Sequence, residues 1–107
     1  MLYKIFIFAP DNEEVIDRII KAASQAGAGI IGNYSQCAFI QKGIGTWKSG
    51  PGSHPFIGEV GKVTHETEVK IEMECPREKA NAVAAAIKAV HPYEQAVVEF
   101  LPIQESL

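Results

Sequence analysis

The pattern of apolar and polar positions at the start of the chain predicts a strand followed by a helix. The run Leu2–Ala9 is rich in β-branched and aromatic residues and has apolar side chains on both faces, which is typical of an inner strand covered on two sides. Apolar side chains then recur with helical spacing over residues 15–26. Asp11 and Glu14 stand at the spacing of a capping box, and Gly27 is a natural left-handed terminator, so we expect the helix between these two signals.

The middle of the chain carries a weaker pattern. Residues 29–45 mix glycines with short apolar runs, and we interpret them as an approach loop followed by a strand around Cys37–Ile40. Thr46–Gly61 holds four of the nine glycines and two of the six prolines, together with the apolar side chains of Trp47 and Phe56. A long loop that carries its own apolar side chains is more often functional than a linker.

The second half of the chain predicts a strand, a helix and a final strand. Side chains alternate with a period of two from Val63 onward. One face takes Val63, Thr67, Val69, Ile71 and Met73, and the other takes Glu66, Glu68, Lys70, Glu72 and Glu74. Pro76 opens the helix and Pro92 ends it. Ala96–Ile103 is the last strand, and Pro102 indicates that its end lies at a sheet edge.

The order strand, helix, strand, strand, helix, strand predicts an α+β fold, a ferredoxin-like βαββαβ sandwich that spans residues 1–107 as one domain. Its four-stranded antiparallel sheet would carry both helices on one face. The other face would expose Lys4 and the acidic row, Glu66, Glu68, Glu72 and Glu74, beside large apolar side chains of the first strand. A mixed patch of this kind usually marks a protein partner, and homo-oligomerisation is the simplest case.

Composition narrows the classes of function. With 107 residues, of which 47% are hydrophobic and 21% charged, the chain is globular rather than disordered, collagenous or coiled-coil. A net charge of -3 has the wrong sign for neutralising phosphates and argues against nucleic acid as the main partner. The N-terminal run does not have the pattern of a signal peptide, and no segment approaches a membrane span. Two cysteines suit a reducing compartment, so we expect a cytoplasmic protein with no membrane partner.

The segment Gly27–Gly32 has the letters of a dinucleotide-binding fingerprint, GxGxxG. That motif needs a strand before it and a helix after it, so that a pyrophosphate meets the helix N-terminus. Here a helix precedes the glycines and a strand follows them. We therefore interpret them as a helix stop and a tight turn.

Three histidines and two cysteines raise the question of a metal site. No CxxC, HxxxH or HxH spacing is present, so only tertiary proximity would assemble one. His65 lies in register with the apolar face of its strand, as a buried imidazole would, and His54 lies in the long loop. His91 begins the sequence HPYE at residues 91–94. It either ends the helix and interacts favourably with the helix dipole, or binds a cation or a polar ligand together with Glu94.

Two further features each have two interpretations. The acidic row is either a solvated face relieved by Lys70 or a buried set of carboxylates that needs basic partners or cations. Trp47 is either a latch over the core of its own domain or an anchor in a neighbour's pocket. No Ser, His and Asp constellation is present, and no sequence feature near Cys37 or Cys75 activates a thiol, so the sequence gives no support to catalysis.

Five blocks of sequence together resemble one protein family. They are GAGIIGNYSQCAF at residues 27–39, GIGTW at 43–47, PFIG at 55–58, EVKIE at 68–72 and HPYE at 91–94. On these blocks the chain resembles the inserted domain of the Nif-three-like dinuclear-metal-centre proteins, from the first strand to about Ile103. That insert is similar in fold to PII and CutA proteins.

The resemblance implies a PII/CutA-like fold, homo-oligomers with a trimer favoured, and a binding or regulatory role. A larger flanking domain builds the family's two-metal site, so no ligand of that site is carried over to these residues. CutA proteins share the HPYE turn and are associated with divalent-cation tolerance, which keeps His91 and Glu94 as metal-ligand candidates. In PII relatives the loop between the second and third strands carries recognition, and Thr46–Gly61 is the matching region. Lys48 and Gln95 depart from the family pattern, and the second change weakens the case for a charged pocket nearby.

We therefore expect a small cytoplasmic, self-assembling binding or regulatory module that is not catalytic. Its ligand or interface residues would be Asn33, Tyr34, Cys37, Trp47, Glu68, His91, Tyr93 and Glu94, and its structural glycines Gly27, Gly32, Gly43, Gly45 and Gly58. The first alternative is a divalent or transition metal-binding protein that uses His91 and Glu94, with Cys37 or His65 meeting them across a subunit boundary. The second alternative is an enzyme that acts on a small molecule through His91 and Glu94 as an acid–base pair.

Overall fold

The structure is a computed structural model that describes residues 1–105. Its elements, in chain order, are β1 (Leu2–Pro10), α1 (Glu13–Gln25), β2 (Phe39–Lys48), β3 (Val63–Pro76), the 3-10 turn η1 (Arg77–Lys79), α2 (Ala80–Val90) and β4 (Val98–Ile103). The order of strands and helices predicted from the sequence is confirmed.

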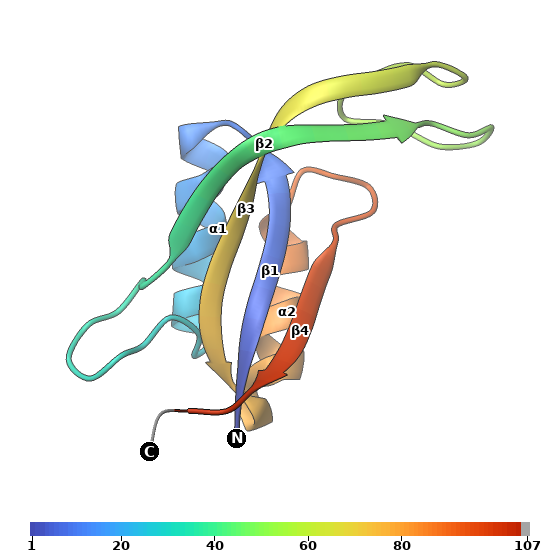
Figure 1. Cartoon of the computed structure of the whole chain (residues 1–107). Helices are drawn as coiled ribbons and strands as arrows, with labels where there is room; N and C mark the ends of the chain where they lie inside the picture. Colours follow the sequence, from blue (N-terminus) through green and yellow to red (C-terminus); the bar gives the residue numbers. More distant parts are fainter. Residues whose placement is uncertain (106–107) are drawn as a thin grey trace.

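The four strands form one antiparallel sheet in the order β2-β3-β1-β4, and both helices cover the same face of it (Figure 1). In the central strand β1, Ile7 pairs with Ile71 of β3 and with Val98 of β4. The edge strand β4 accepts Pro102 because an edge position does not need its missing N–H. This is the expected ferredoxin-like α+β sandwich. Neither described helix has the length and apolar character needed to cross a bilayer.

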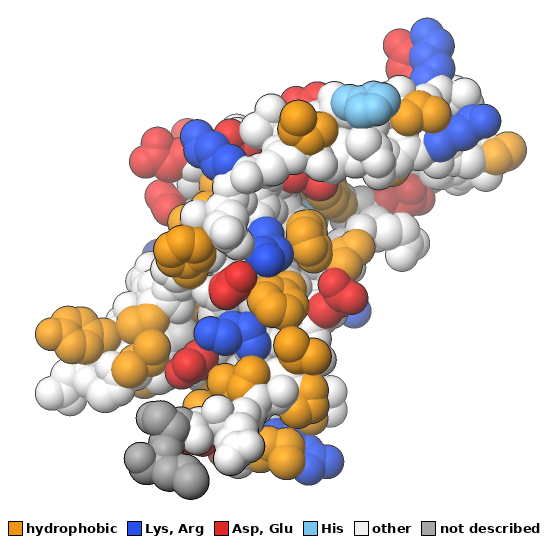
Figure 2. Space-filling view, in the orientation of Figure 1, with side chains coloured by type: hydrophobic (Ala, Val, Ile, Leu, Met, Phe, Trp, Pro, Cys, Tyr) orange, Lys and Arg blue, Asp and Glu red, His pale blue; other side chains and the backbone are white. Residues whose placement is uncertain are grey.

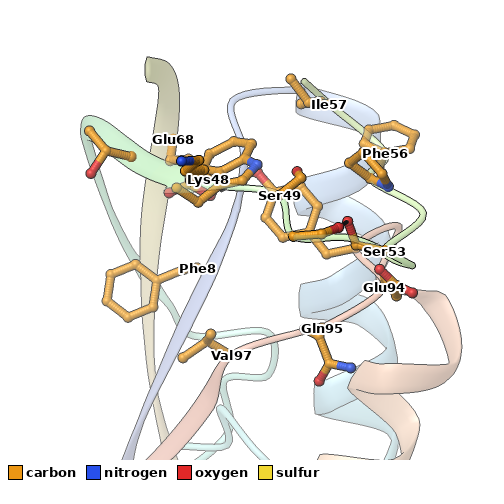
Figure 3. A pocket seen from close by; sticks show the side chains of 15 residues that line it. Phe8, Lys48, Ser49, Ser53, Phe56, Ile57, Glu68, Glu94, Gln95 and Val97 are labelled. Carbon is orange, nitrogen blue, oxygen red and sulfur yellow. Dashed lines mark hydrogen bonds between the residues drawn. The ribbon is translucent and has the colours of Figure 1, made fainter. Parts of the chain in front are cut away.

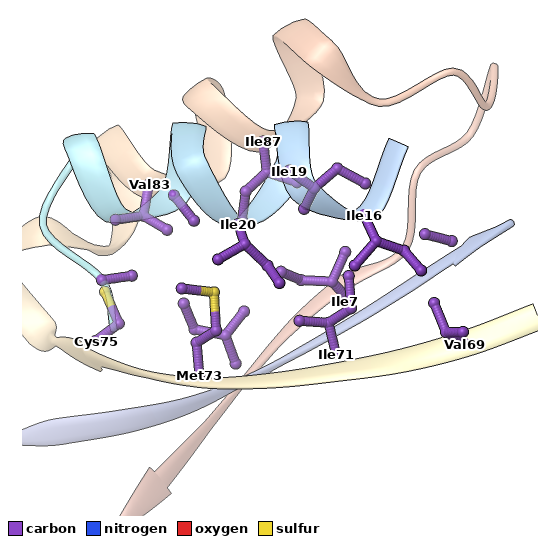
Figure 4. Packing of buried hydrophobic residues seen from close by; sticks show 14 of the residues in the cluster. Ile7, Ile16, Ile19, Ile20, Val69, Ile71, Met73, Cys75, Val83 and Ile87 are labelled. Carbon is purple, nitrogen blue, oxygen red and sulfur yellow. The ribbon is translucent and has the colours of Figure 1, made fainter. Parts of the chain in front are cut away.

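The core lies between the sheet and the helices, where isoleucine and valine side chains interdigitate (Figure 4). Ile5 and Ile7 of β1 and Ile71 of β3 are fully buried. They form one cluster with Ile19 of α1 and Ile87 of α2. Burial of each such side chain contributes about 1.5–3 kcal/mol, so this layer holds both helices on the sheet.

β1 is covered on one face only, which corrects the prediction of a strand covered on two sides. Ile5, Ile7 and Ala9 are buried, whereas Phe6 and Phe8 remain partly exposed on the opposite face. The reason is topological. Both helices connect parallel strands, and such crossovers share one hand, so both helices lie on the same side of the sheet.

α1 begins one residue later than the capping signals predicted. Its N-cap is Asn12, whose side-chain oxygen accepts the Val15 N–H at 3.1 Å. The cap is therefore not Asp11, and the capping box with Glu14 does not form. Glu14 instead lies in the first turn, where a carboxylate interacts favourably with the helix dipole. Gly27, with φ of 120°, follows the end of the helix as predicted.

The second helix and the last strand also begin later than predicted. Pro76 is the last residue of β3 rather than the first of a helix, and η1 leads from it into α2 at Ala80. β4 begins at Val98 rather than Ala96, because residues 91–97 form the turn that carries the chain from α2 to the sheet edge.

β2 and the start of β3 form a two-stranded arm that extends past the end of β1 and beyond the helices (Figure 1). We define this arm as residues 44–48 and 63–67. Trp47 was predicted in a loop, but it is a strand residue of the arm. Because the helices end short of the arm, Val63 and His65 are exposed. This corrects the interpretation of His65 as a buried imidazole. The loop at the tip, which we call the tip loop, is residues 49–62.

The sheet face opposite the helices is mixed in character, as predicted (Figure 2). Hydrophobic side chains there alternate with acidic and basic ones. Lys70 forms an ion pair of 3.4 Å with Glu72, and its ammonium group lies 5.1 Å from the centre of the Phe6 ring. The glutamates of the acidic row are half-buried, between the two predicted interpretations, and within residues 1–105 Lys70 pairs only with Glu72 of that row.

Candidate functional site

Tyr93 is the centre of an aromatic cluster at the base of the arm. Its hydroxyl donates a 2.7 Å hydrogen bond to Oε2 of Glu68 on β3. The ring centroids of Trp47, Phe56 and His91 lie 6.1, 6.3 and 4.9 Å from the centroid of the Tyr93 ring. β2, β3, the tip loop and the turn after α2 therefore meet at one side chain. Trp47 contacts Tyr93 of its own chain and is not part of the buried core cluster, so both of its predicted roles, the latch over the core and the anchor in a neighbour's pocket, stay predictions.

His91 fixes the turn that carries Tyr93. Pro92 disfavours helical backbone at the residue before it, so α2 ends at Val90, and the C-cap His91 is extended, with φ of -74° and ψ of 132°. The imidazole is buried, with Nε2 2.7 Å from the Phe8 carbonyl oxygen, while Nδ1 accepts the Tyr93 N–H at 3.1 Å. The carbonyl requires a proton on Nε2 and the N–H requires a lone pair on Nδ1, so these contacts select the Nε2–H tautomer.

Gly45 makes room for the Glu68 carboxylate. A Cβ added at Gly45 would overlap the carboxyl group of Glu68, which lies across the β2 backbone. The carboxylate reaches Tyr93 from this position. By contrast, a Cβ at Gly43 would meet open space, and its φ is not positive. The prediction that Gly43 serves the backbone geometry is therefore not supported.

Three other predicted structural glycines have the left-handed backbone that favours this residue. Gly27, Gly32 and Gly58 have φ of 120°, 58° and 96°. At Gly58, in the tip loop, an added Cβ would also collide with the side-chain oxygen of Thr64. This glycine therefore allows the tip loop to return closely against β3.

Glu94 ties the tip loop to the turn after α2. Its Oε2 accepts the backbone N–H of His54 at 2.9 Å, across 40 residues of sequence. The His54 residue is exposed, as expected for a histidine in the long loop. This bond and the contact of Phe56 with Tyr93 hold the tip loop back against the sheet.

These contacts surround a cavity of about 420 Å³, which we call the aromatic cavity (Figure 3). Its apolar lining comes mainly from Phe8, Trp47, Phe56, Ile57, Tyr93 and Val97. In Figure 3, Phe8 and Val97 lie on one side of it, and Ser49, Ser53 and Phe56 lie on the other. A mostly apolar cavity of this size with a few polar groups is typical of small-molecule sites.

The environment of Tyr93 keeps its hydroxyl protonated. Burial raises the pKa of the Tyr93 phenol well above its ordinary value, and the hydrogen bond to Glu68 and the charges of Glu68 and Glu66 raise it further. Tyr93 is therefore a permanent donor at neutral pH. Its one proton is directed at the Glu68 carboxylate.

Five of the eight predicted site residues come together here: Trp47, Glu68, His91, Tyr93 and Glu94. The other three, Asn33, Tyr34 and Cys37, lie in the loop before β2. Residues Ile31 and Tyr34 exchange backbone hydrogen bonds of 3.0 Å in that loop, and the Cys37 N–H donates to Gly29 at 2.8 Å. Gly29 in turn donates to the Glu74 carbonyl, six positions along β3 from Glu68 and about 20 Å away. The two groups form separate places on the molecule.

The predicted metal ligands are not part of a larger donor cluster. Within residues 1–105, no group of three or more His, Cys, Asp or Glu side chains is placed to hold an ion. Both ring nitrogens of His91 are engaged by Phe8 and Tyr93, and Glu94 accepts from His54. A metal ion bound by His91 and Glu94 stays a prediction, and its binding would have to replace one of these contacts.

Several residues that line the aromatic cavity were not named from the sequence. Phe8 contributes because its strand is open on the face away from the helices, which hydrophobic periodicity did not reveal. The turns that hold or flank Ser49, Ser53 and Val97 carry no recognisable sequence motif. The sequence feature that could have indicated this cavity was the apolar pair Phe56 and Ile57 in a glycine-rich segment.

The sequence is similar to part of several longer bacterial proteins. It is 41% identical over 102 residues to the GTP cyclohydrolase 1 type 2 homolog of Halalkalibacterium halodurans, and 38% identical over 105 residues to that of Bacillus subtilis. These matches cover 95% and 98% of this chain but only 27% and 28% of the relatives. The chain therefore spans about a quarter of the length of the relatives that it matches. No protein-family model matches it.

Solved structures agree with these matches. A Bacillus cereus protein related to NIF3 superposes with a TM-score of 0.81 and 32% identity, over 97% of this chain and 26% of that one. The periplasmic divalent cation tolerance protein CutA of Archaeoglobus fulgidus superposes with a TM-score of 0.72 and 23% identity, over 100% and 88%. The second likeness shows the fold alone. Nearly all of this chain is therefore similar to a segment of the NIF3-related protein, and that segment makes up about a quarter of the protein. The chain also has the fold of CutA.

Proposed function

We propose that this protein is a self-assembling binding or regulatory domain that takes a small molecule in the aromatic cavity. The observation that carries the proposal is the convergence of four aromatic rings, Phe8, Trp47, Phe56 and Tyr93, around a cavity of about 420 Å³. Soluble proteins seldom keep aromatic side chains around open space unless something fills it.

A binding role rather than catalysis is favoured by how the polar groups are engaged. The Tyr93 hydroxyl donates to Glu68, and both ring nitrogens of His91 are bonded to backbone groups. A general acid or base needs a proton or lone pair free to reach a substrate. The relatives named GTP cyclohydrolase 1 type 2 homolog are about four times as long as the matched segment, so an activity of theirs is not assigned to these residues.

Self-association is supported by the mixed open face of the sheet. Phe6 and Phe8 are partly exposed there and Leu101 is 52% exposed, all on the side away from the helices. We favour a homotrimer, by the resemblance to CutA and PII proteins. Both cysteines are free thiols, which agrees with the cytoplasmic location that we propose.

Divalent-cation binding is the second candidate, because the CutA protein that shares this fold is named for divalent cation tolerance. The carboxylates of Glu68 and Glu94 line the aromatic cavity, and Glu68 bonds to Tyr93, whose ring contacts that of His91. Native mass spectrometry before and after a chelator separates the two candidates. A subunit mass unchanged by the chelator supports the small-molecule domain, and a chelator-labile metal supports the cation.

The small-molecule site is tested by a fragment screen read by NMR, with the indole N–H of Trp47 as reporter. Trp47 is the only tryptophan of the chain, so its signal reports on the cavity without ambiguity. We expect hits that shift this signal in the wild type and lose binding in Val97→Phe, which fills the cavity. Val63→Phe is the matched control, because Val63 is also exposed but lies outside the lining. Equal loss in both variants, or no hit at Trp47, would contradict the proposal.

A further inference from the structure

We infer that the ligand of the aromatic cavity is a small organic cation, an ammonium or guanidinium group carried on an apolar body. This inference rests on the proposed function, because it names the class of ligand for the same cavity. Two independent features carry it: the faces of the aromatic walls and a carboxylate that has no basic partner.

The aromatic walls favour a cation over a neutral ligand of the same shape. The rings of Trp47 and Phe56 lie at 52° and 51° to the Tyr93 ring, so the three rings do not stack flat on one another. Phe8 lines the cavity from the sheet side. Aromatic faces carry partial negative charge and attract a cation within about 6 Å, most strongly when it is withdrawn from water.

The second feature is the Glu68 carboxylate, which lines the cavity and is only partly exposed. The ion pairs among residues 1–105 join Lys42 to Asp11, Lys62 to Glu59 and Lys70 to Glu72. Neither Glu68 nor Glu94 therefore has a basic side chain paired with it in that part of the chain. A partly buried carboxylate is stabilised by a cation, and a ligand can supply one.

Glu68 also keeps acceptor capacity for such a ligand. The Tyr93 hydroxyl occupies Oε2 at 2.7 Å, and a carboxylate accepts up to about four hydrogen bonds. The Tyr93 phenol keeps its own proton and only donates a hydrogen bond to the carboxylate. An ammonium N–H that entered the cavity would find both a charged acceptor and aromatic faces beside it.

The charged groups that face the cavity favour a cation on balance. Glu68 and Glu94 line it, against one basic residue, Lys48. Lys48 and Glu94 are both exposed, so water screens their charges more than that of the partly buried Glu68, which therefore decides the balance. Lys70 lies two residues after Glu68 on β3, and its ammonium group pairs with Glu72 and lies over the Phe6 ring.

The test compares three probes with the same phenyl body and different charge: phenethylammonium, phenylethanol and phenylpropionate. Binding to the full chain is measured by calorimetry at neutral pH, and the fluorescence of Trp47 locates it. We expect the cation to bind about tenfold more tightly than the alcohol, and the anion to bind most weakly.

Glu68→Gln tests the role of the carboxylate, because glutamine removes the charge and keeps an acceptor for Tyr93. We expect the preference for the cation to fall severalfold in this variant, to the part that the aromatic walls supply, while the alcohol binds as before. Glu72→Gln is the matched control, since Glu72 lies on the same strand and face but outside the cavity lining. It should keep the full preference.

The outcomes separate this inference from the proposed function. If the alcohol or the anion binds as tightly as the cation, the cavity is a ligand site and the inferred charge is wrong. If none of the three probes binds, both the ligand class and the proposed function are overturned. If Glu68→Gln keeps the full cation preference, the Glu68 carboxylate is not its source, however large that preference is. The wild-type probe series decides the charge preference even if Glu68→Gln does not fold.

Discussion

The Tyr93 hydroxyl and the Glu68 carboxylate are joined by a 2.7 Å hydrogen bond that spans 25 residues of sequence. The bond links the turn after α2 to β3, and both residues line the aromatic cavity. It therefore couples the stability of the turn to the charge inside the site.

Removal of this bond should destabilise the fold measurably. Hydrogen bonds to charged groups contribute roughly 1.5–3 kcal/mol, and the partial exposure of this pair reduces that figure, so we expect Tyr93→Phe to lower the free energy of unfolding by about 1 kcal/mol. Urea denaturation measures it. Tyr3→Phe is the control, because the Tyr3 ring packs on Phe100 and keeps that contact. A change below that of the control would show that the bond is not formed in solution.

Gly45 and Gly43 offer a matched pair of substitutions on one strand. Gly45→Ala should push the Glu68 carboxylate away from Tyr93 and lower the free energy of unfolding by about 1–2 kcal/mol, whereas Gly43→Ala should change it by less than about 0.5 kcal/mol. Thermal unfolding of both variants checks this. Because Gly45→Ala acts through the bond, its effect should shrink in the Tyr93→Phe background. Full additivity would contradict the coupling.

The raised pKa of Tyr93 predicts a stability change at alkaline pH. Burial, followed by the bond to Glu68 and nearby negative charge, raises the pKa of the folded phenol above its unfolded value of 10.0. The folded state therefore binds the Tyr93 proton more tightly than the unfolded state does. The stabilisation that this gives the fold is fully present below pH 10 and is lost as the pH rises toward the folded pKa. Denaturation midpoints measured below and above pH 10 should fall more steeply with rising pH for the wild type than for Tyr93→Phe. Parallel curves would refute the shift.

His91 should matter to stability whether or not a metal is present. His91→Ala removes two hydrogen bonds from a buried side chain and leaves the Phe8 carbonyl without its partner, so we expect a loss of about 2–4 kcal/mol. The melting temperature of the wild type, measured with and without a chelator, gives the companion result. We expect no shift, because no metal ion is needed for the contacts of the imidazole. A chelator-dependent drop in the wild type alone would favour the metal-binding alternative.

Glu94 should control the order of the tip loop more than global stability. Glu94→Gln weakens the bond to the His54 N–H, so hydrogen exchange across residues 49–62 should become faster. Because Glu94 is exposed, the free energy of unfolding should change by less than about 0.5 kcal/mol. Glu59→Gln, an exposed glutamate paired with Lys62 within the same loop, is the control. Unchanged exchange at the loop in Glu94→Gln would exclude the tether.

Local patterns predicted the elements well because strands and helices differ in the period of their apolar residues. The alternation from Val69 to Met73 and the helical repeat ending in Val90 needed no information from distant residues. Where the structure differed, a distant element decided the outcome. His65 keeps the register of the buried row, but it is exposed because the helices end before the arm. Asn12 replaced Asp11 as the cap although both types serve that position.

The site was predictable in part for the same reason. The HPYE turn and Trp47 were recognisable as short motifs, and Glu68 as one member of a row. Their assembly depends on sheet register, which pairs Glu68 with Gly43 so that its side chain reaches diagonally over Gly45, and which places Phe8 beneath the turn. The same register separates Cys37 and Tyr34 from them, since both precede β2 at the opposite end of the strand. A motif-based grouping had no means of detecting that distance.

The bond between the His91 ring and the Phe8 carbonyl joins positions 83 residues apart. Because Tyr93, Glu94 and Val97 complete the aromatic cavity, a growing chain on the ribosome cannot form it until residue 97 has emerged. Closing so long a loop is entropically costly, so the bond should form late in folding, after the local helices. A chain that stalls or is trimmed before Tyr93 would thus lack the ring at the centre of the cavity, and ligand binding would report that this domain has been synthesised through the turn after α2.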